Sequence, residues 1–197
     1  MNDNSPVLHL ASRSPRRAEL LQLLGVAFVL VDVEVDESQR PAEAPADYVR
    51  RVAAGKARAG AAKLGPGAVV LAADTTVSVD GDIFGKPRDQ ADASAMLARL
   101  SGRWHEVFTA VVVAVDGHHH IEVVKTRVEF RVLDVATISA YWRSGEPADK
   151  AGAYGIQGLG GALIKRIDGS YGAVVGLPLC ETVGLLEKVG IAHALSM

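Results

Sequence analysis

Two adjacent arginines stand where a short strand should turn into a helix. Residues 12–17, Ser-Arg-Ser-Pro-Arg-Arg, follow the apolar residues 7–11, and Ser14 precedes a proline as an N-cap would. Backbone N–H groups and the positive dipole end make a helix start an anion-binding site. Cations there are disfavoured by roughly 0.3–1 kcal/mol each. The placement of Arg16 and Arg17 therefore favours a phosphate site over two solvated arginines, and we expect removal of Arg17 to leave ligand-free stability unchanged or slightly higher.

Carboxylates occupy the ends of two predicted strands. Asp74 directly follows the buried apolar run 68–73, where open α/β sheets place their ligands. Glu34, Asp36 and Glu37 lie at the end of the run 26–35, which is rich in β-branched residues, and such carboxylates can hold a hard divalent cation. Taken alone, Asp74 is explained equally well as an aspartate that simply ends its strand. The acidic residues of 34–37 are explained better as a solvated turn.

Further polar residues have surroundings that suit phosphate or base recognition. Lys86 lies between a glycine and a proline, and Lys56 falls within the predicted helix 45–63, although surface solvation explains either lysine by itself. Residues 150–161 contain five glycines and one amide, Gln157. Glycines allow the backbone to approach a ligand closely. The chain has neither a dinucleotide fingerprint nor a Walker A motif, which argues against a P-loop kinase or GTPase.

Two other features favour plain structural explanations. The consecutive histidines 118–120 lie at a predicted turn, where adjacent side chains diverge, so a solvated turn explains them better than a metal site. The single cysteine, Cys180, excludes an internal disulfide and a cysteine-based metal site, and it suits a small apolar position in a helix.

The composition is that of an ordinary globular protein. The chain has 197 residues, of which 49% are hydrophobic and 22% charged, and its formal net charge is −2. This balance argues against a nucleic-acid or membrane surface. The first residues lack the pattern of a signal peptide, and no apolar run is long enough to span a bilayer. We therefore expect one domain over residues 1–197, in the cytoplasm.

Helices and strands mix along the whole chain and must position these side chains. The predicted helices cover residues 15–24, 45–63, 90–100, 138–143 and 178–189. The predicted strands cover residues 7–11, 26–35, 68–73 with a continuation over 76–79, 106–115, 121–133, 162–167 and 173–175. Asp80-Gly81 and Asp116-Gly117 are turn signals, and the second predicts a long hairpin. The expected architecture is α/β with a mixed sheet.

In combination, these segments resemble the Maf family of nucleotide pyrophosphatases, from Leu10 to about Leu186. The matching segments are residues 11–17, 35–37, 56–57, 73–75, 85–87, 100–102, 149–161 and 175–178. The resemblance implies an extended mixed β-sheet with flanking helices, in two lobes around a cleft, related to the inosine triphosphate pyrophosphatases. It also implies a homodimer and a divalent cation, Mg²⁺ or Mn²⁺.

The resemblance also assigns roles to individual residues. Asp74 matches the family's acceptor of the water proton, and its role as a metal ligand instead stays open. The implied phosphate ligands are Ser14, Arg17, Lys56 and Lys86, and the implied metal ligands are Glu37 and Asp74. Residues 149–158 resemble the branch that hydrolyses dTTP and UTP, in which Arg16, Thr75 and Gln157 match positions that tune base choice.

The expected activity is hydrolysis of a nucleoside triphosphate between its α- and β-phosphates, which yields a monophosphate and pyrophosphate. The alternative is a regulator of cell division that binds nucleotides without turnover. The intact charged set of Arg17, Lys56, Asp74 and Lys86 favours the enzyme.

Overall fold

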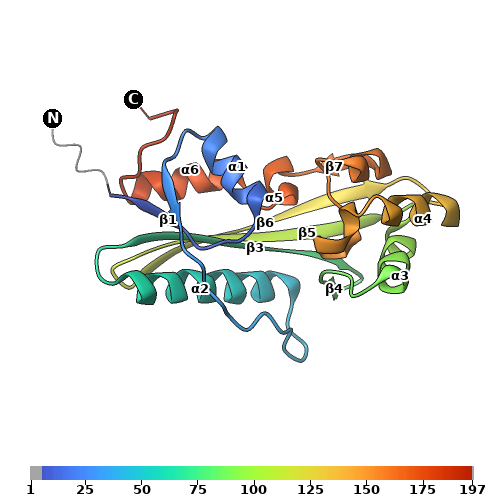
Figure 1. The fold of residues 1–197 in the computed structure, drawn as a ribbon, viewed down its shortest axis with the longest axis horizontal. Coiled ribbons are helices and arrows are strands. Elements are labelled where there is room, and N and C mark those ends of the chain that lie inside the picture. Colours follow the sequence, from blue (N-terminus) through green and yellow to red (C-terminus); the bar gives the residue numbers. More distant parts are fainter. Residues whose placement is uncertain (1–5, 197) are drawn as a thin grey trace.

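The computed structural model describes residues 6–196 as an elongated sheet with helices on both faces (Figure 1). The strands are β1 (Leu8–Leu10), β2 (Phe28–Leu30), β3 (Val69–Val79), β4 (Asp82–Phe84), β5 (Trp104–Val115), β6 (His118–Phe130) and β7 (Ile164–Asp168). The α-helices are α1 (Pro15–Leu23), α2 (Pro45–Leu64), α3 (Gln90–Leu100), α4 (Val135–Arg143), α5 (Tyr171–Val175) and α6 (Leu179–Lys188). Three 3₁₀ turns are η1 (Glu146–Asp149), η2 (Ala151–Ala153) and η3 (Leu159–Leu163). Among the described helices, none is both long and apolar enough to span a membrane.

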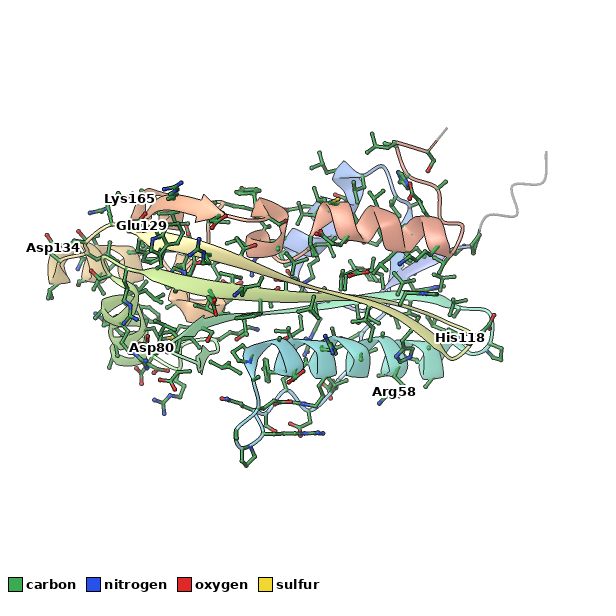
Figure 2. The ribbon with its side chains drawn as sticks, turned by 180° about the vertical axis from the view of Figure 1, so that it is seen from behind. Arg58, Asp80, His118, Glu129, Asp134 and Lys165 are labelled. Atoms are coloured by element: carbon green, nitrogen blue, oxygen red, sulfur yellow. The ribbon has the colours of Figure 1, made fainter. Side chains whose placement is uncertain are left out.

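The sheet is mixed, as predicted, and has the order β2-β1-β3-β5-β6-β7, with β4 paired to β3. β1 runs parallel to β2 and β3, and the other pairs are antiparallel. Both Asp-Gly turns have positive φ at both residues, 56° and 86° at Asp80-Gly81 and 46° and 80° at Asp116-Gly117, which is the hairpin geometry that Asp-Gly favours. Figure 2 shows the length of the β5–β6 hairpin, with His118 near one end of the molecule and Asp134 near the other.

Helices cover the two faces of the sheet differently along its length (Figure 1). At one end, α2 packs on one face, against Val70 and Ala72 of β3, while α1, α5 and α6 pack on the other, around Leu71 and Ala73. At the other end, α3, α4 and the turn η2 enclose a separate core around Val77 and Phe130. The alternation of β3 thus sends successive side chains to opposite layers.

The second core contains a buried histidine. His105 is 2% exposed, its Nε2 lies 2.8 Å from the hydroxyl of Tyr154, and its ring packs edge-on against Phe130 and Tyr154. Its Nδ1 is buried without a hydrogen-bond partner. Burial lowers the pKa of His105 to about 4. The native core therefore holds this imidazole in its neutral form.

This burial predicts a specific acid sensitivity. Because the folded pKa lies below the ordinary value of 6.5, the unfolded chain takes up this proton first as the pH falls. The contribution of His105 to the free energy of unfolding is therefore fully present above pH 6.5. It falls by about 3 kcal/mol as the pH decreases to 4. Urea unfolding of wild type and of His105→Gln at pH 7 and pH 4.5 should show a smaller loss in the variant. Equal losses in the two proteins would assign the acid sensitivity to other groups.

Several predicted elements differ from the structure. The strand predicted over residues 26–35 is reduced to Phe28–Leu30, because its partner β1 ends at Leu10 and leaves later residues nothing to pair with. Residues 34–37 therefore lie in a loop rather than at a strand end. The strand predicted over 173–175 is the helix α5, which begins where the Ser170 side chain accepts a hydrogen bond from the backbone N–H of Ala173, at 3.2 Å.

Other boundaries shift for local reasons. α4 begins at Val135 rather than Ile138, because the Asp134 side chain caps it by accepting from the N–H of Thr137 at 2.7 Å. The strand predicted over 162–167 is Ile164–Asp168, since the turn η3 occupies the residues before it. The short strand β4 was not predicted.

Candidate active site

A cleft of about 730 Å³ brings together every predicted site residue. These residues are Ser14, Arg16, Arg17, Glu37, Lys56, Asp74, Thr75, Lys86 and Gln157. The lining carries six lysine or arginine side chains against four aspartate or glutamate side chains, in a chain whose net charge is −2. A locally cationic cleft in a weakly acidic protein suits a polyanionic ligand.

The cleft opens at a gap in the sheet beside β3. On one side of β3, β1 pairs with Val69–Leu71 and β4 pairs with Val77–Val79, and within the described residues no strand pairs with 72–76 on that side. On the other side β5 pairs without interruption from Val70 to Ser78. Because Asp74 and Thr75 are adjacent in a strand, they point to opposite faces. Side chains from both faces of the sheet, among them Asp74 and Thr75, therefore reach the same cleft at this gap.

Arg17 is buried at the start of α1, with 9% of its surface exposed. Its Nε donates to the carbonyl oxygen of Gly176 at 2.8 Å, Nη1 donates to Ser12 Oγ at 3.2 Å, and Nη2 donates to Thr75 Oγ1 at 3.2 Å. Burial lowers the pKa of Arg17, and the nearby charge of Asp74 opposes that shift. The guanidinium thus joins α1, β3 and the end of α5.

These contacts argue against the expectation that Arg17 is dispensable for ligand-free stability. The helix-dipole argument treats Arg17 as solvated, whereas it supplies a donor to a buried carbonyl of Gly176. Removal would leave that carbonyl unpaired, which costs about 1–3 kcal/mol. This loss exceeds the few tenths to 1 kcal/mol that relief of the dipole mismatch returns. Arg17 is therefore structural as well as a candidate ligand.

A chain of hydroxyl groups continues from Arg17 into the core. Thr75 Oγ1 lies 2.9 Å from Thr109 Oγ1, which lies 2.7 Å from the carbonyl oxygen of Ala173. Each hydroxyl has one proton, so the arrangement is satisfied when Arg17 donates to Thr75, Thr75 to Thr109, and Thr109 to Ala173. The hydroxyl of Thr75 therefore has both its hydrogen-bond partners within the protein. Its effect on a ligand comes chiefly from the way it orients Arg17.

On the other face of the sheet, Lys56 joins two carboxylates. Its Nζ lies 2.7 Å from Asp74 Oδ1 and 2.9 Å from Glu37 Oε1. Burial raises the pKa of Asp74 above its ordinary value, and the opposing charges of Lys56 and Arg17 do not cancel that rise. Burial also raises the pKa of Glu37, but Lys56 together with the charges of Lys86 and Arg17 more than offsets that rise, so the net pKa of Glu37 is lowered. The two carboxylates therefore differ in proton affinity although they share one ammonium group.

The loop that carries Glu37 is held by α2. Tyr48 Oη donates to the carbonyl oxygen of Glu37 at 2.9 Å. Arg51 donates to the carbonyl oxygens of Asp36 and Ser38 at 3.3 and 2.9 Å, and its Nε and Nη2 bind the carboxylate of Glu43 at 2.6 and 2.8 Å. Sequence reasoning missed Tyr48 and Arg51, since nothing in their spacing distinguishes them from other α2 surface residues.

Within residues 6–196, the side-chain polar groups of the remaining candidate phosphate ligands make no hydrogen bond to the protein. Ser14 occupies the N-cap position of α1, as predicted, but its side chain makes no capping hydrogen bond, so its hydroxyl remains available. Lys86 lines the cleft in the loop after β4, and the carbonyl oxygen of neighbouring Gly85 accepts from the N–H of Gly152 at 3.0 Å. Both residues are thus placed to meet an anion that enters the cleft.

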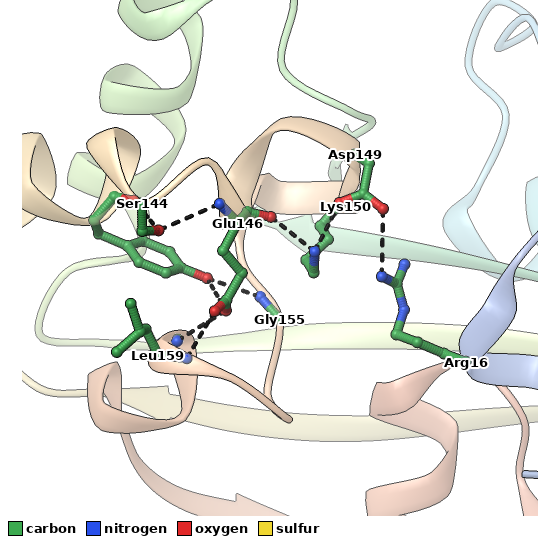
Figure 3. Close-up of polar contacts among 9 residues, drawn as sticks. Arg16, Ser144, Glu146, Asp149, Lys150, Gly155 and Leu159 are labelled. Carbon is green, nitrogen blue, oxygen red and sulfur yellow. Dashed lines mark hydrogen bonds and ion pairs between the residues drawn. The ribbon is translucent and has the colours of Figure 1, made fainter. Parts of the chain in front are cut away.

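At the other wall, the η1 turn faces α1. Arg16 Nη1 lies 3.4 Å from Asp149 Oδ2, and Lys150 Nζ donates to Asp149 Oδ1 at 2.7 Å (Figure 3). Glu146 also lines the cleft. So does Gln157, which lies in the glycine-rich loop formed by residues 150–161. Sequence reasoning singled out Arg16 and Gln157. It did not single out Glu146, and it included Asp149 only in the segment 149–161 without a role, because an acidic residue beside a proline or lysine looks like ordinary surface.

The carboxylates Glu37 and Asp74 are the place where the cleft fits a divalent cation. They already share one cationic group, the ammonium of Lys56. Within residues 6–196 no group of three or more potential His, Cys, Asp or Glu ligands is present. Mg²⁺ is commonly held by one or two carboxylates together with substrate phosphates. The pair therefore fits a cation shared with a bound phosphate chain better than a closed structural site.

The fold and the cleft define an α/β protein with a cationic site for a phosphorylated ligand, built at a gap in a mixed sheet. Residues 7–189 match the family described as Maf-like protein. The chain belongs to this family.

Several relatives are similar over nearly the whole chain. A dTTP/UTP pyrophosphatase of Methylobacillus flagellatus is 55% identical over 98% of this chain and 97% of its own. The corresponding figures are 54%, 93% and 92% for a dTTP/UTP pyrophosphatase of Hahella chejuensis, and 54%, 92% and 97% for one of Vibrio cholerae. The solved Ham1 protein of Staphylococcus aureus overlaps 62% of this chain and 71% of its own at 12% identity, with a TM-score of 0.44.

Proposed function

We propose that this chain hydrolyses dTTP and UTP to the nucleoside monophosphate and pyrophosphate. Relatives with this activity in their names share 54–55% of residues with it over nearly their full length. The structural observation that carries the proposal is the arrangement around β3, where Arg17 lies on one face and the Asp74–Lys56–Glu37 set on the other, within one cationic cleft.

The phosphate chain binds among the cationic groups of the cleft. Ser14 and the first turn of α1 offer a hydroxyl and backbone N–H groups, and Lys56 and Lys86 add positive charge. Arg17 spends three of its five N–H groups on Gly176, Ser12 and Thr75. Its remaining N–H groups are donors for phosphate oxygens, in a guanidinium whose orientation is already fixed. Fixed donors stabilise developing charge without reorganising during the reaction.

Asp74 acts on the attacking water. Its raised pKa makes it a better proton acceptor than an ordinary aspartate, and its neighbour Lys56 keeps it oriented. Glu37 and Asp74 would also hold Mg²⁺ or Mn²⁺, which supplies neutralisation of the phosphate oxygens when bound. Whether Asp74 serves chiefly as base or as ligand, its carboxylate is required for turnover.

The base lies toward the glycine-rich wall. Gln157 offers one acceptor and two donors, which match the N3–H and a carbonyl of uracil or thymine. Arg16 lies opposite, held by Asp149 across the cleft. Thr75 contributes through its contact with Arg17. The proposal extends to a homodimer in the cytoplasm, as the family resemblance implies.

Product analysis tests the proposal directly. Incubation of the protein with UTP and Mg²⁺ should release UMP and pyrophosphate, resolved by ³¹P NMR or ion-exchange chromatography. Formation of UDP and orthophosphate would show that the wrong bond is assigned. Tight UTP binding without turnover would instead support a nucleotide-binding regulator.

A further inference from the structure

The carboxylate of Glu146 gathers three hydrogen bonds from around the glycine-rich loop (Figure 3). It accepts from Tyr141 Oη at 2.7 Å, from the backbone N–H of Leu159 at 2.7 Å and from that of Gly160 at 3.0 Å. Hydrogen bonds to an ionised acceptor are roughly twice as strong as neutral ones. Burial raises the pKa of Glu146, but these three donors together with the charge of Lys150 outweigh burial, so the net pKa is lowered and the group stays ionised.

Tyr141 ties the other end of the same loop. Its hydroxyl, which donates to Glu146, accepts from the backbone N–H of Gly155 at 3.1 Å. The tyrosine ring is 5% exposed and packs in the core around α3 and α4. The entry of the loop at Gly155 and its exit at Gly160 are therefore both fixed to one Tyr141–Glu146 unit anchored in that core.

Two glycines of the loop are explained by this unit. A Cβ atom added at Gly158 would lie 2.2 Å from Glu146 Oε2. A Cβ atom added at Gly160 would lie 2.4 Å from Tyr141 Oη and 2.5 Å from the carbonyl oxygen of Gly155. The loop backbone comes this close to the tyrosine and the carboxylate only because these positions have no side chain.

Gln157 lies between the two points at which the loop is hydrogen-bonded to this unit, Gly155 and Leu159–Gly160. It lines the cleft, and within residues 6–196 its side chain makes no hydrogen bond to the protein. An amide can turn over to suit either uracil or cytosine, whose hydrogen-bonding edges are reversed. Discrimination between them therefore requires neighbouring groups that fix the orientation of the amide, and the position of the backbone beneath Gln157 decides whether the amide reaches those groups and the base together.

We propose that Tyr141 and Glu146 are positioning residues for base selection, because they fix both ends of the loop that presents Gln157. This inference rests on the proposed pyrimidine nucleotide hydrolysis. It assigns base selectivity to two residues that need not touch the base.

The experiment compares Glu146→Gln and Tyr141→Phe with wild type, with Gln157→Ala, and with the matched control Glu129→Gln. Glu129 is likewise a hydrogen-bonded carboxylate, whose partner is Lys165 of the neighbouring strand at 3.1 Å, and it lies outside the cleft lining (Figure 2). The measured quantities are kcat/KM for UTP, dTTP, CTP and GTP, the Kd of pyrophosphate by calorimetry, and hydrogen exchange at Leu159 and Gly160. Tyr141→Phe keeps the buried ring, so it tests the idea if Glu146→Gln folds poorly.

The preference for UTP over CTP should fall about tenfold in both loop variants and in Gln157→Ala. Exchange at Leu159 and Gly160 should accelerate in Glu146→Gln, while the pyrophosphate Kd and the Glu129→Gln control stay at wild-type values. An unchanged UTP to CTP ratio in Glu146→Gln and Tyr141→Phe, beside a reduced ratio in Gln157→Ala, would overturn the proposal.

Failure of the proposed function has a different signature. A wild-type protein that releases no pyrophosphate from UTP contradicts the hydrolysis itself, and UTP and CTP affinities by calorimetry then replace kcat/KM. Whether or not the protein hydrolyses UTP, hydrogen exchange at Leu159 and Gly160 measures how firmly Glu146 holds the loop. Exchange at Leu159 and Gly160 that is as fast in wild type as in Glu146→Gln would overturn the positioning role.

Discussion

Replacement of Asp74 with asparagine is expected to lower kcat for UTP hydrolysis by about 10²–10⁴, the usual effect of losing a positioned base. Asparagine keeps the shape of the side chain and removes the charge that accepts the proton of water. It also removes a ligand for the divalent cation, so both roles proposed for Asp74 predict the loss. The measurement is steady-state pyrophosphate release with saturating UTP and Mg²⁺.

The same variant should remain folded. Burial raises the pKa of Asp74 in the native state, so the fold binds its proton more tightly than the unfolded chain does. Stability from this group is therefore present at low pH and is lost as the pH rises toward the raised pKa. At neutral pH, Asp74→Asn relieves this penalty and should unfold at the same or a higher temperature than wild type. Near-normal kcat would contradict both roles, and Asp82→Asn, an exposed carboxylate paired with Arg99 at 2.8 Å, is the matched control.

Arg17→Ala is expected to lose both nucleotide affinity and ligand-free stability. Hydrogen bonds to charged groups contribute about 1.5–3 kcal/mol, so pyrophosphate should bind roughly 10–150-fold more weakly. The unpaired carbonyl oxygen of Gly176 should lower the free energy of unfolding by about 1–3 kcal/mol. Arg17→Lys keeps the charge but cannot reach Gly176, Ser12 and Thr75 with one planar fork, so it should recover only part of either loss. Calorimetry and urea unfolding measure the two quantities.

The control for this variant is Arg58→Ala on the exposed surface of α2 (Figure 2). It removes the same group from a position outside the cleft lining, and both quantities should stay at wild-type values. Wild-type stability in Arg17→Ala would show that the Gly176 carbonyl finds another donor. Wild-type pyrophosphate affinity would remove Arg17 from the phosphate site.

The sequence predicted those parts of the fold that depend on local chemistry. Asp80-Gly81 and Asp116-Gly117 adopt the positive φ values that their residue types favour, and Ser14 stands at the N-cap of α1. The error over residues 26–35 has a nonlocal cause. A β-branched run can continue as a strand only where a partner strand continues beside it, and the length of β1 is not visible in that run.

The candidate site shows the same division. Asp74 could be predicted from the buried apolar run before it, although it lies within β3 rather than at the end of a strand, whereas Glu37 reaches Lys56 from a loop. The residues that hold such loops, Arg51 and Glu146, act through backbone groups distant in the sequence. The backbone partners of Arg51 and Glu146 become identifiable only when the fold brings them together. Neither the type nor the spacing of these residues in the sequence predicts the contacts.

The interruption beside residues 72–76 also bears on self-association. An unpaired strand edge is a template for pairing with another chain, and proteins usually protect such edges with charges, bulges or short strands. Here the open stretch is flanked by β1 and β4 on the same side of β3, so an incoming strand would find only five residues before it met one of them. A small ligand can enter that space, but an extended polypeptide is excluded. The interruption therefore leaves room for a small ligand beside a central strand without offering a continuous strand edge to a second copy of the chain.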